Sequence, residues 1–397
     1  MFEYMEDAEE VSKELADIYA KASRQLNYRI DEIYDKFKDR HGLTDKEAMA
    51  LLNTLKNKND IAALKQALAG KAKTDPGYAD LLAKLESQAY GARIERLEQL
   101  QTEIDRMMQG IYNQEKRITT SHYKDLAKNS YYREIYNVQR KVGFQFSFSA
   151  VDPKMINMLL NSKWSGKNYS ARIWDNTKGL ASELKEQMIL GMLTGKTEGE
   201  MAKEIANKYA AGAFEARRLV RTESNFISGQ MQLAAYKECK SEEYDFVATL
   251  DLRTSKICRE LDGKTFKIKD GKPGVNMNPM HPFCRSTTMI HMDDELKKRL
   301  KRDAWDPEKK EWKKVPATMS YNEWYKKNVA NNPKALAAEK MIKNHASDKK
   351  QYERYRSVMG KKAGKTLEDF QETKYNNPEK WEEIKKQNRK TRTQKEK

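Results

Sequence analysis

Apolar residues near the N-terminus recur every three or four positions. The helix period of about 3.6 residues places such a set along one face of a helix. The sequence therefore predicts two long helices, forming a helical hairpin or arm, with ordinary bundle packing as the alternative. A capping box at Thr44 and Glu47 and a turn at Pro76-Gly77 are expected between them. The first apolar stripe is Val11, Leu15, Ile18, Ala22, Leu26, Ile30, Ile33 and Phe37, and the second is Ile94, Leu97, Leu100, Ile104, Met108 and Ile111.

The period changes in the middle of the chain. Phe144, Phe146 and Phe148 alternate with polar residues, which predicts a strand. Helical spacing returns over residues 180–192 and 214–240. After these helices, three short alternating segments predict a small antiparallel sheet, at residues 244–250, 264–268 and 286–292.

The composition limits the size of the core. The 397 residues are 38% apolar and 34% charged, with a mean hydropathy of −0.95. A typical soluble domain is about 45–50% apolar and about 25% charged. A single large α/β enzyme core is therefore not expected. The composition favours a highly charged helical protein with a modest globular centre.

The positive charge is concentrated near the C-terminus. Residues 301–397 hold 27 Lys and Arg against 15 Asp and Glu, a surplus of 12 out of the net charge of +17. Cations that neutralise phosphates gain free energy by counterion release, so nucleic acid is the first partner to consider. The alternative is a solvated, lysine-rich tail that keeps the protein soluble.

The cysteine content and the hydropathy of the sequence indicate the cellular compartment in which the protein is expected. Three cysteines in so long a chain do not make a disulfide scaffold, and they suggest a reducing compartment. The acidic N-terminus MFEYMEDAEE does not resemble a secretory signal. The most apolar run, residues 188–193, is far shorter than the roughly 20 residues that span a bilayer. We expect a soluble, non-secreted protein without membrane contact.

One block of the sequence carries potential metal ligands. Cys258, His281 and Cys284 can converge on one ion, and Asp251 or Cys239 is the candidate for a fourth ligand of a tetrahedral zinc site. The alternatives are two small buried cysteines with a hydrogen-bonded histidine, or a catalytic Cys–His dyad without an evident orienting acid.

A second group of charged residues lies on a predicted helix. Arg218, Arg221 and Glu223 predict a buried ion network, with phosphate binding by Arg221 as the alternative. The chain has no phosphate loop, dinucleotide fingerprint, nucleophile elbow or zinc-protease helix motif. We therefore assign no catalytic residue.

The central motifs resemble, in order, the MuF-type minor head protein family of tailed bacteriophages, also called the head-morphogenesis family. The resemblance covers about residues 140–295. The motifs that carry it are WSGKNYSARIWDN from Trp164, ARRLVRTESN from Ala216, DLRTSKICRELDGKTF from Asp251 and NPMHPFCRSTTMI from Asn278.

The resemblance implies a mainly α fold with a small α+β core. We expect an N-terminal helical arm at residues 1–135, a MuF-like domain at 136–295 and a basic helical tail at 296–397. Carried over by position, the family's polar cluster maps onto Asp251, Cys258, His281, Cys284 and Arg285, with Arg221 and Glu223 on the preceding helix. Many family members have another cysteine where this chain has Ser255, so any zinc site lacks that thiolate. We group as a structural polar cluster Arg218, Arg221, Glu223, Arg253 and Arg285.

The resemblance also implies a non-enzymatic component of the virion. Its expected partners are the portal protein, a capsid or scaffold protein, and double-stranded DNA. Its expected place is the capsid interior near the portal vertex, after assembly in the host cytoplasm. Two rivals stay open: a metal-dependent hydrolase acting through the Cys/His block, and a generic DNA-binding protein.

Overall fold

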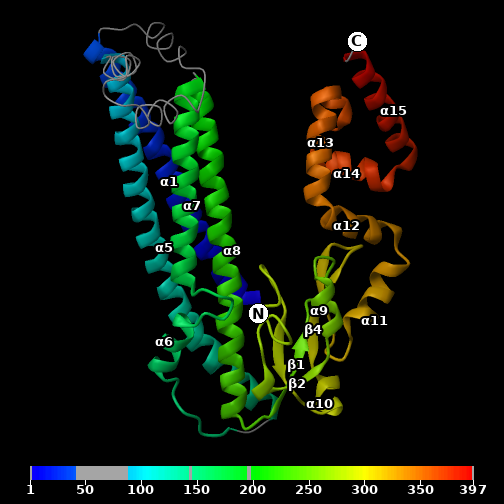
Figure 1. The fold of residues 1–397 in the computed structure, drawn as a ribbon. Helices are drawn as coiled ribbons and strands as arrows, with labels where there is room; N and C mark the ends of the chain where they lie inside the picture. Colours follow the sequence, from blue (N-terminus) through cyan, green and yellow to red (C-terminus); the bar gives the residue numbers. More distant parts are fainter. Residues whose placement is uncertain (1, 42–87, 143–144, 195–197, 396–397) are drawn as a thin grey trace, which may run out of the picture. The chain divides into compact units, whose positions relative to one another are not determined.

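The computed structural model describes residues 2–41, 88–142, 145–194 and 198–395 (Figure 1). The predictions for Thr44, Glu47 and Pro76-Gly77, and the Phe144 end of the predicted strand, lie outside these ranges. The chain forms two compact units, each described here by itself. One comprises residues 1–235 and 281–284, and the other residues 236–280 and 285–397.

The first unit is a bundle of long helices, which lie side by side in Figure 1. Its helices are α1 (Phe2–His41), α5 (Gln88–Val142), α6 (Pro153–Asn161), α7 (Tyr169–Thr194) and α8 (Glu198–Glu238). The long helices predicted from the apolar stripes are confirmed. The N-terminal pair does not stand apart as an arm, however, because α1 and α5 share one core with α7 and α8. That core includes Leu15, Tyr19, Leu26, Leu100, Ile104, Leu184, Ile205, Tyr209 and Val220.

The strand predicted around Phe146 and Phe148 is wrong. Residues 145–152 have no regular secondary structure, and Phe148 is 43% exposed. Two side chains of α5 hold this segment instead. The Tyr131 hydroxyl donates to the Ser149 carbonyl (3.1 Å) and the Gln139 amide to the Phe146 carbonyl (2.7 Å). Alternation alone does not make a strand when no partner strand is within reach.

The second unit begins with the small sheet that the sequence predicted. Its strands are β1 (Glu243–Val247), β2 (Thr265–Lys267) and β3 (Thr287–Ile290). β1 lies in the middle, antiparallel to both neighbours, with Tyr244 opposite Phe266 on one side and Ile290 on the other. Tyr244 and Phe246 are fully buried, as strong alternation predicts. The short helix α9 (Lys256–Leu261) and the 3-10 turn η1 (Ile268–Asp270) complete this part.

The region after the sheet was expected to be helical, and it contains an unexpected hairpin. After α10 (Asp294–Arg299), β4 (Lys301–Asp306) pairs antiparallel with β5 (Glu311–Pro316), followed by α11 (Tyr321–Tyr325) and the π-helical turn η2 (Lys326–Ala330). The hairpin and α11 share a core with the chain just after β1. Members of that core are Leu250, Leu252, Ala304, Val315, Tyr321, Trp324, Val329 and Ala335.

The chain then forms a set of short helices around aromatic side chains. Their bounds are α12 (Pro333–Lys343), α13 (His345–Met359), η3 (Gly360–Ala363), α14 (Leu367–Asn376) and α15 (Pro378–Lys395). Phe370 lies at their centre, with ring centroids 5.5 Å from Tyr352 and 5.1 Å from Trp381. Among the described residues, no helix combines the length and apolar character needed to cross a membrane.

Candidate functional site

Two of the sequence motifs meet at the loop 281–284. Thr222 and Asn225 lie on α8, one turn apart, within the ARRLVRTESN motif. The Thr222 hydroxyl accepts a hydrogen bond from the backbone N–H of Phe283 (3.2 Å), and the Asn225 side-chain amide donates to the carbonyl of Cys284 (2.9 Å). Phe283 has a positive φ of 58°, a conformation that a non-glycine residue adopts only when its surroundings hold it. The helix therefore fixes the backbone that carries His281 and Cys284.

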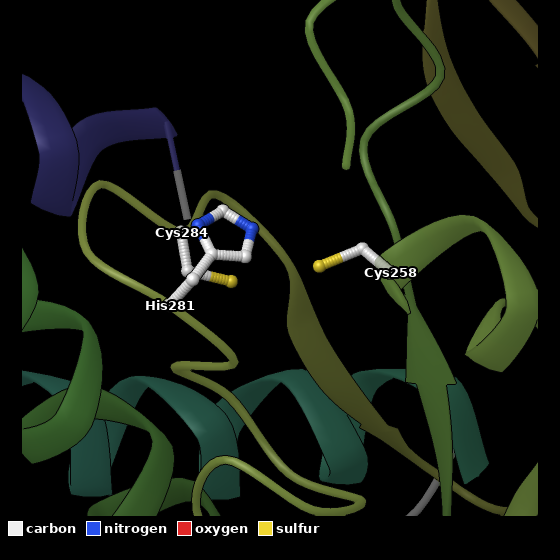
Figure 2. Close-up of side chains that lie close together, drawn as sticks. All are labelled: Cys258, His281 and Cys284. Atoms are coloured by element: carbon white, nitrogen blue, oxygen red, sulfur yellow. The ribbon is translucent and has the colours of Figure 1, made fainter. Parts of the chain in front are cut away.

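The three predicted metal ligands come together. The Sγ atoms of Cys258 and Cys284 and a ring nitrogen of His281 all lie within 4.8 Å of one another (Figure 2). Both cysteines are buried, and His281 is partly buried. Two thiolates and one imidazole match the soft and borderline donors that zinc prefers. The residues present therefore fit a zinc ion.

His281 has the tautomer that such a site needs. Its Nδ1 atom lies 2.8 Å from the carbonyl oxygen of Pro282. A carbonyl oxygen only accepts hydrogen bonds, so Nδ1 is the donor, and in the neutral ring Nε2 keeps the lone pair that a metal ion requires. A hydrogen bond of this kind from the non-ligating nitrogen is the usual outer support of a metal-binding histidine.

Ser255 has a clear structural role in place of a thiolate. It is the N-cap of α9, and its hydroxyl accepts a hydrogen bond from the backbone N–H of Cys258 (3.3 Å). This contact fixes the start of the helix that presents Cys258. The departure from the family pattern therefore supports the position of one ligand while contributing none itself.

The carboxylate of Asp251 is engaged by other groups. The two terminal guanidinium nitrogens of Arg285 donate to it, Nη2 at 2.8 Å, and the Thr254 hydroxyl donates to it at 3.0 Å. Burial alone would raise the pKa of Asp251, but the interactions with Arg285, Thr254 and Arg253 together outweigh burial and hold this pKa below its usual value. Arg253, whose side chain is 64% exposed, approaches the same carboxylate only to 3.9 Å. Among the described residues, the ligand atoms that lie within 4.8 Å of one another are those of Cys258, His281 and Cys284, and the carboxylate of Asp251 is not one of them.

The arginines of α8 contact α1. Arg221 and Arg217 both bind the carboxylate of Glu9, Arg217 at 2.8 Å through each of two nitrogens. These pairs hold the pKa of Glu9 below its usual value despite partial burial. Arg218 instead pairs with Glu215 on the surface of the same helix.

Glu223 belongs to a different set of contacts. It accepts a hydrogen bond from the indole N–H of Trp164 (3.1 Å) and lies 3.7 Å from the Nε of Arg172. Burial outweighs both contacts and raises the pKa of Glu223 to about 7. The indole ring also stacks on Phe226, with centroids 4.8 Å apart. Glu223 therefore anchors the WSGKN turn to α8.

The five residues grouped from the sequence as a polar cluster thus divide into separate sets. Arg221 and Arg218 have different partners, Glu223 supports Trp164, and Arg285 with Arg253 surrounds Asp251. The motif spacing did not single out Asn225, Thr222 or Asp262, whose buried carboxylate binds Arg302 (3.0 Å). All three stand inside the motifs that carried the family resemblance, and that was the available signal.

Comparisons with known proteins agree with these motifs. A curated protein of Enterococcus faecalis, named NAD(+)--arginine ADP-ribosyltransferase EFV, is 25% identical over 263 residues, which cover 62% of this chain and 53% of that protein. The chain therefore spans about half the length of the curated relative it matches. No solved structure matches. Residues 182–289, which include α8, most of the small sheet and all three potential metal ligands, match the model of the family described as Phage Mu protein F like protein, so this segment of the chain is similar to the MuF-type phage head morphogenesis proteins.

Proposed function

We propose that this protein is a minor component of a phage head that associates with the portal protein during assembly and contacts the packaged DNA. The observation that carries the proposal is the match over residues 182–289 to the head-morphogenesis family. Within that region, the RTESN motif of α8 holds the HPFCR loop through Thr222 and Asn225. Together they favour a folded domain of this family over a chance similarity of motifs.

The shapes of the parts are consistent with a connecting role. The bundle of the first unit offers long helical faces for a protein partner. The C-terminal region offers cationic surface, since residues 301–397 have a surplus of 12 positive charges. A protein that contacts both a portal and DNA needs surfaces of these two kinds.

Co-purification from assembled heads tests the portal association. Particles carrying an affinity-tagged portal are purified from cells that express the head genes, and this chain is quantified by mass spectrometry against particles assembled without portal. We expect a few copies per particle in the first preparation and none in the second. Absence of the chain from portal-containing particles would contradict the proposal.

We further propose that Cys258, His281 and Cys284 bind a zinc ion. Such an ion would link α9 to the loop 281–284 and stabilise the domain, as structural zinc does in small domains. Asp251, held by Arg285, is not required as a ligand.

Metal content of the full chain, purified without chelator, tests this site. We expect about one zinc per chain, a loss of zinc in Cys258→Ser and Cys284→Ser, and retention in the matched control Cys239→Ser. Loss of zinc in Cys239→Ser would identify that thiolate as the fourth ligand. A wild-type chain purified without zinc, and unable to bind it from a buffered solution, would refute the metal site.

The name of the curated relative raises an enzymatic alternative, although about half of that protein lies outside the match. Labelling of an arginine-containing acceptor by the purified chain with NAD+ would support a transferase. Turnover of nucleic acid or peptide that disappears in His281→Ala would support the hydrolase alternative. We expect neither activity.

A further inference from the structure

The C-terminal helices have one face turned toward an aromatic core. In α13, Asp348, Tyr352 and Tyr355 recur at helical spacing, and the Tyr355 ring stacks on Trp381 with centroids 5.8 Å apart. Asp348 is fully buried and accepts hydrogen bonds from Gln371, Lys374 and Tyr375. The inner face of α13 is therefore fully used by packing within the unit.

The outer face of α13 is cationic. Lys350 and Arg354 lie one helical turn apart, and Lys361 and Lys362 follow in η3 just after the helix. All four side chains are exposed. We call these four residues the α13 ridge. Among the described residues, no ion pair or hydrogen bond involves their side chains.

The acids of this segment do not neutralise the α13 ridge. Residues 345–365 contain seven Lys and Arg against two acids, Asp348 and Glu353. Asp348 is buried and engaged by Lys374 at 2.6 Å, so only the exposed Glu353 remains on the outer side of the helix. Like charges one turn apart destabilise a helix by about 0.2–0.5 kcal/mol. The ridge therefore carries a small cost that an anionic partner would remove.

The length of the α13 ridge suits a duplex. From Lys350 to its end at Met359, α13 extends roughly 14 Å, and the chain then turns at Gly360, whose φ is 60°. Double-stranded DNA carries about eight phosphate charges over such a length. The ridge lacks exposed aromatic side chains for stacking on unpaired bases, because Tyr352 is buried and Tyr355 packs on Trp381.

We propose that the α13 ridge binds the phosphate backbone of double-stranded DNA without sequence specificity. This inference rests on the DNA contact in the proposed function, and it assigns that contact to Lys350, Arg354, Lys361 and Lys362. Contact by the remaining lysines of the tail is not needed for the assignment.

Salt-dependent binding of the full chain to a 30-base-pair duplex tests the α13 ridge. The ridge variant is Lys350→Gln, Arg354→Gln, Lys361→Gln and Lys362→Gln combined. The matched control removes four exposed charges from the helical unit: Lys124→Gln, Lys128→Gln, Lys178→Gln and Lys203→Gln. Each lost phosphate contact reduces the slope of log K against log salt by about 0.9, so four lost contacts reduce it by about 3.6. We expect that reduction in the ridge variant and an unchanged slope in the control.

Other outcomes would overturn the assignment. The ridge variant could have the same slope of log K against log salt as the wild-type chain, or the ridge and control variants could lose the same amount of slope. Either result would mean that the chain binds DNA, but not through the α13 ridge. A wild-type chain that binds poly-glutamate and not the duplex would favour an acidic protein partner and would also remove DNA from the proposed function. Circular dichroism of both variants shows whether α13 is still folded.

Discussion

Glu115 is a fully buried carboxyl group in the core of the helical unit. Its Oε2 atom accepts a hydrogen bond from the Tyr19 hydroxyl (2.9 Å), and Oε1 has no hydrogen-bond partner among the described residues. Burial raises the pKa of Glu115 to about 7. The residue is therefore a buried acid without a compensating cation.

We predict that Glu115→Gln makes the helical unit more stable at pH 8. The folded state holds a proton that the unfolded state releases near its own pKa of about 4.3. Stability is therefore greatest below that pH and falls as the pH rises toward 7, by about 4 kcal/mol in total. Glutamine keeps the shape and avoids this loss. Urea unfolding of the two chains between pH 4 and 8 measures the difference.

The exposed residue Glu6 provides the control, because Glu6→Gln should leave the pH dependence unchanged. Glu223, whose pKa is also raised to about 7 by burial, should account for much of the dependence that remains in Glu115→Gln. A Glu115→Gln chain with the wild-type pH profile would contradict the assignment of a buried, protonated acid.

Asp251 shows the opposite behaviour, because a cation compensates its burial. We predict that Asp251→Asn destabilises the second unit by about 3–5 kcal/mol at pH 7, since Arg285 is then buried without its counterion. The lowered pKa of Asp251 means that its stabilisation is complete above its unfolded pKa and is lost as the pH falls through the folded value. Denaturant unfolding followed by tryptophan fluorescence measures both effects.

The control for Asp251 is Asp303, which forms a surface pair with Lys314 on the hairpin (2.8 Å). Asp303→Asn should cost less than about 1 kcal/mol, because exposed ion pairs are screened by water. Similar losses of unfolding free energy in Asp251→Asn and Asp303→Asn would show that the buried ion pair stabilises the unit no more than the surface pair does.

At the scale of elements, α8 packs closely against α1 and α7 at Gly212. A Cβ atom at this position would lie 2.7 Å from a ring carbon of Tyr19 and 2.8 Å from a methyl of Leu180. Both side chains belong to the core. Only a glycine fits there without displacing them.

We predict that Gly212→Ala destabilises the bundle. Overpacking of this kind costs about 1–3 kcal/mol, which exceeds the gain of about 1 kcal/mol that alanine offers in a helix. Gly179→Ala in α7 is the matched control, because no atom lies within 4 Å of a Cβ there, and it should stabilise the bundle slightly. Thermal unfolding followed by circular dichroism distinguishes the two. If Gly212→Ala stabilises the bundle instead, the Tyr19 ring moves away from the added methyl group without a loss of packing free energy.

The elements differ in how far local sequence determines them. The long helices and the β1–β3 sheet follow from periodic apolar residues, and both were predictable. The β4–β5 hairpin was not, because few of its residues are apolar and its buried residues Ala304 and Val315 pack on Leu250 and Leu252, far away in the chain. Phe146 and Phe148 show the reverse error, since they alternate with polar residues but no strand of the described residues pairs with them.

The candidate site shows the same limit. The spacing of Cys258, His281 and Cys284 predicted their approach. The ion pair between Asp251 and Arg285 was not predictable, and neither were the hydrogen bonds that Thr222 and Asn225 form with the loop 281–284. These contacts join residues far apart in the sequence, and they leave no local sequence pattern. The order of the four motifs along the sequence identified the region that contains the site. It did not reveal which residues of these motifs contact one another.

At the scale of the whole molecule, the expected boundary at residues 295/296 crosses a single packed region. Asp262, within the DGK motif, binds Arg302 of the hairpin (3.0 Å) and the backbone N–H of Tyr321 (2.7 Å). Arg259, next to Cys258, lies over the Tyr321 ring at 4.7 Å and pairs with Glu339 at 2.8 Å. The motif region and residues 301–343 therefore depend on each other.

We predict that a chain ending at residue 295 loses the fold of the second unit, whereas a chain ending at residue 343 keeps it. The shorter chain lacks Trp324 and Tyr321, which are buried against Leu250 and Leu252, and each fully buried large side chain contributes about 1.5–3 kcal/mol. The longer chain lacks only the helices from α13 onward, and with them the α13 ridge. Near-ultraviolet circular dichroism and limited proteolysis should report a folded unit only in the longer chain. That chain should also have the shallow salt dependence of the ridge variant. Equal resistance to protease in both truncated chains would show that residues 236–295 fold without the hairpin.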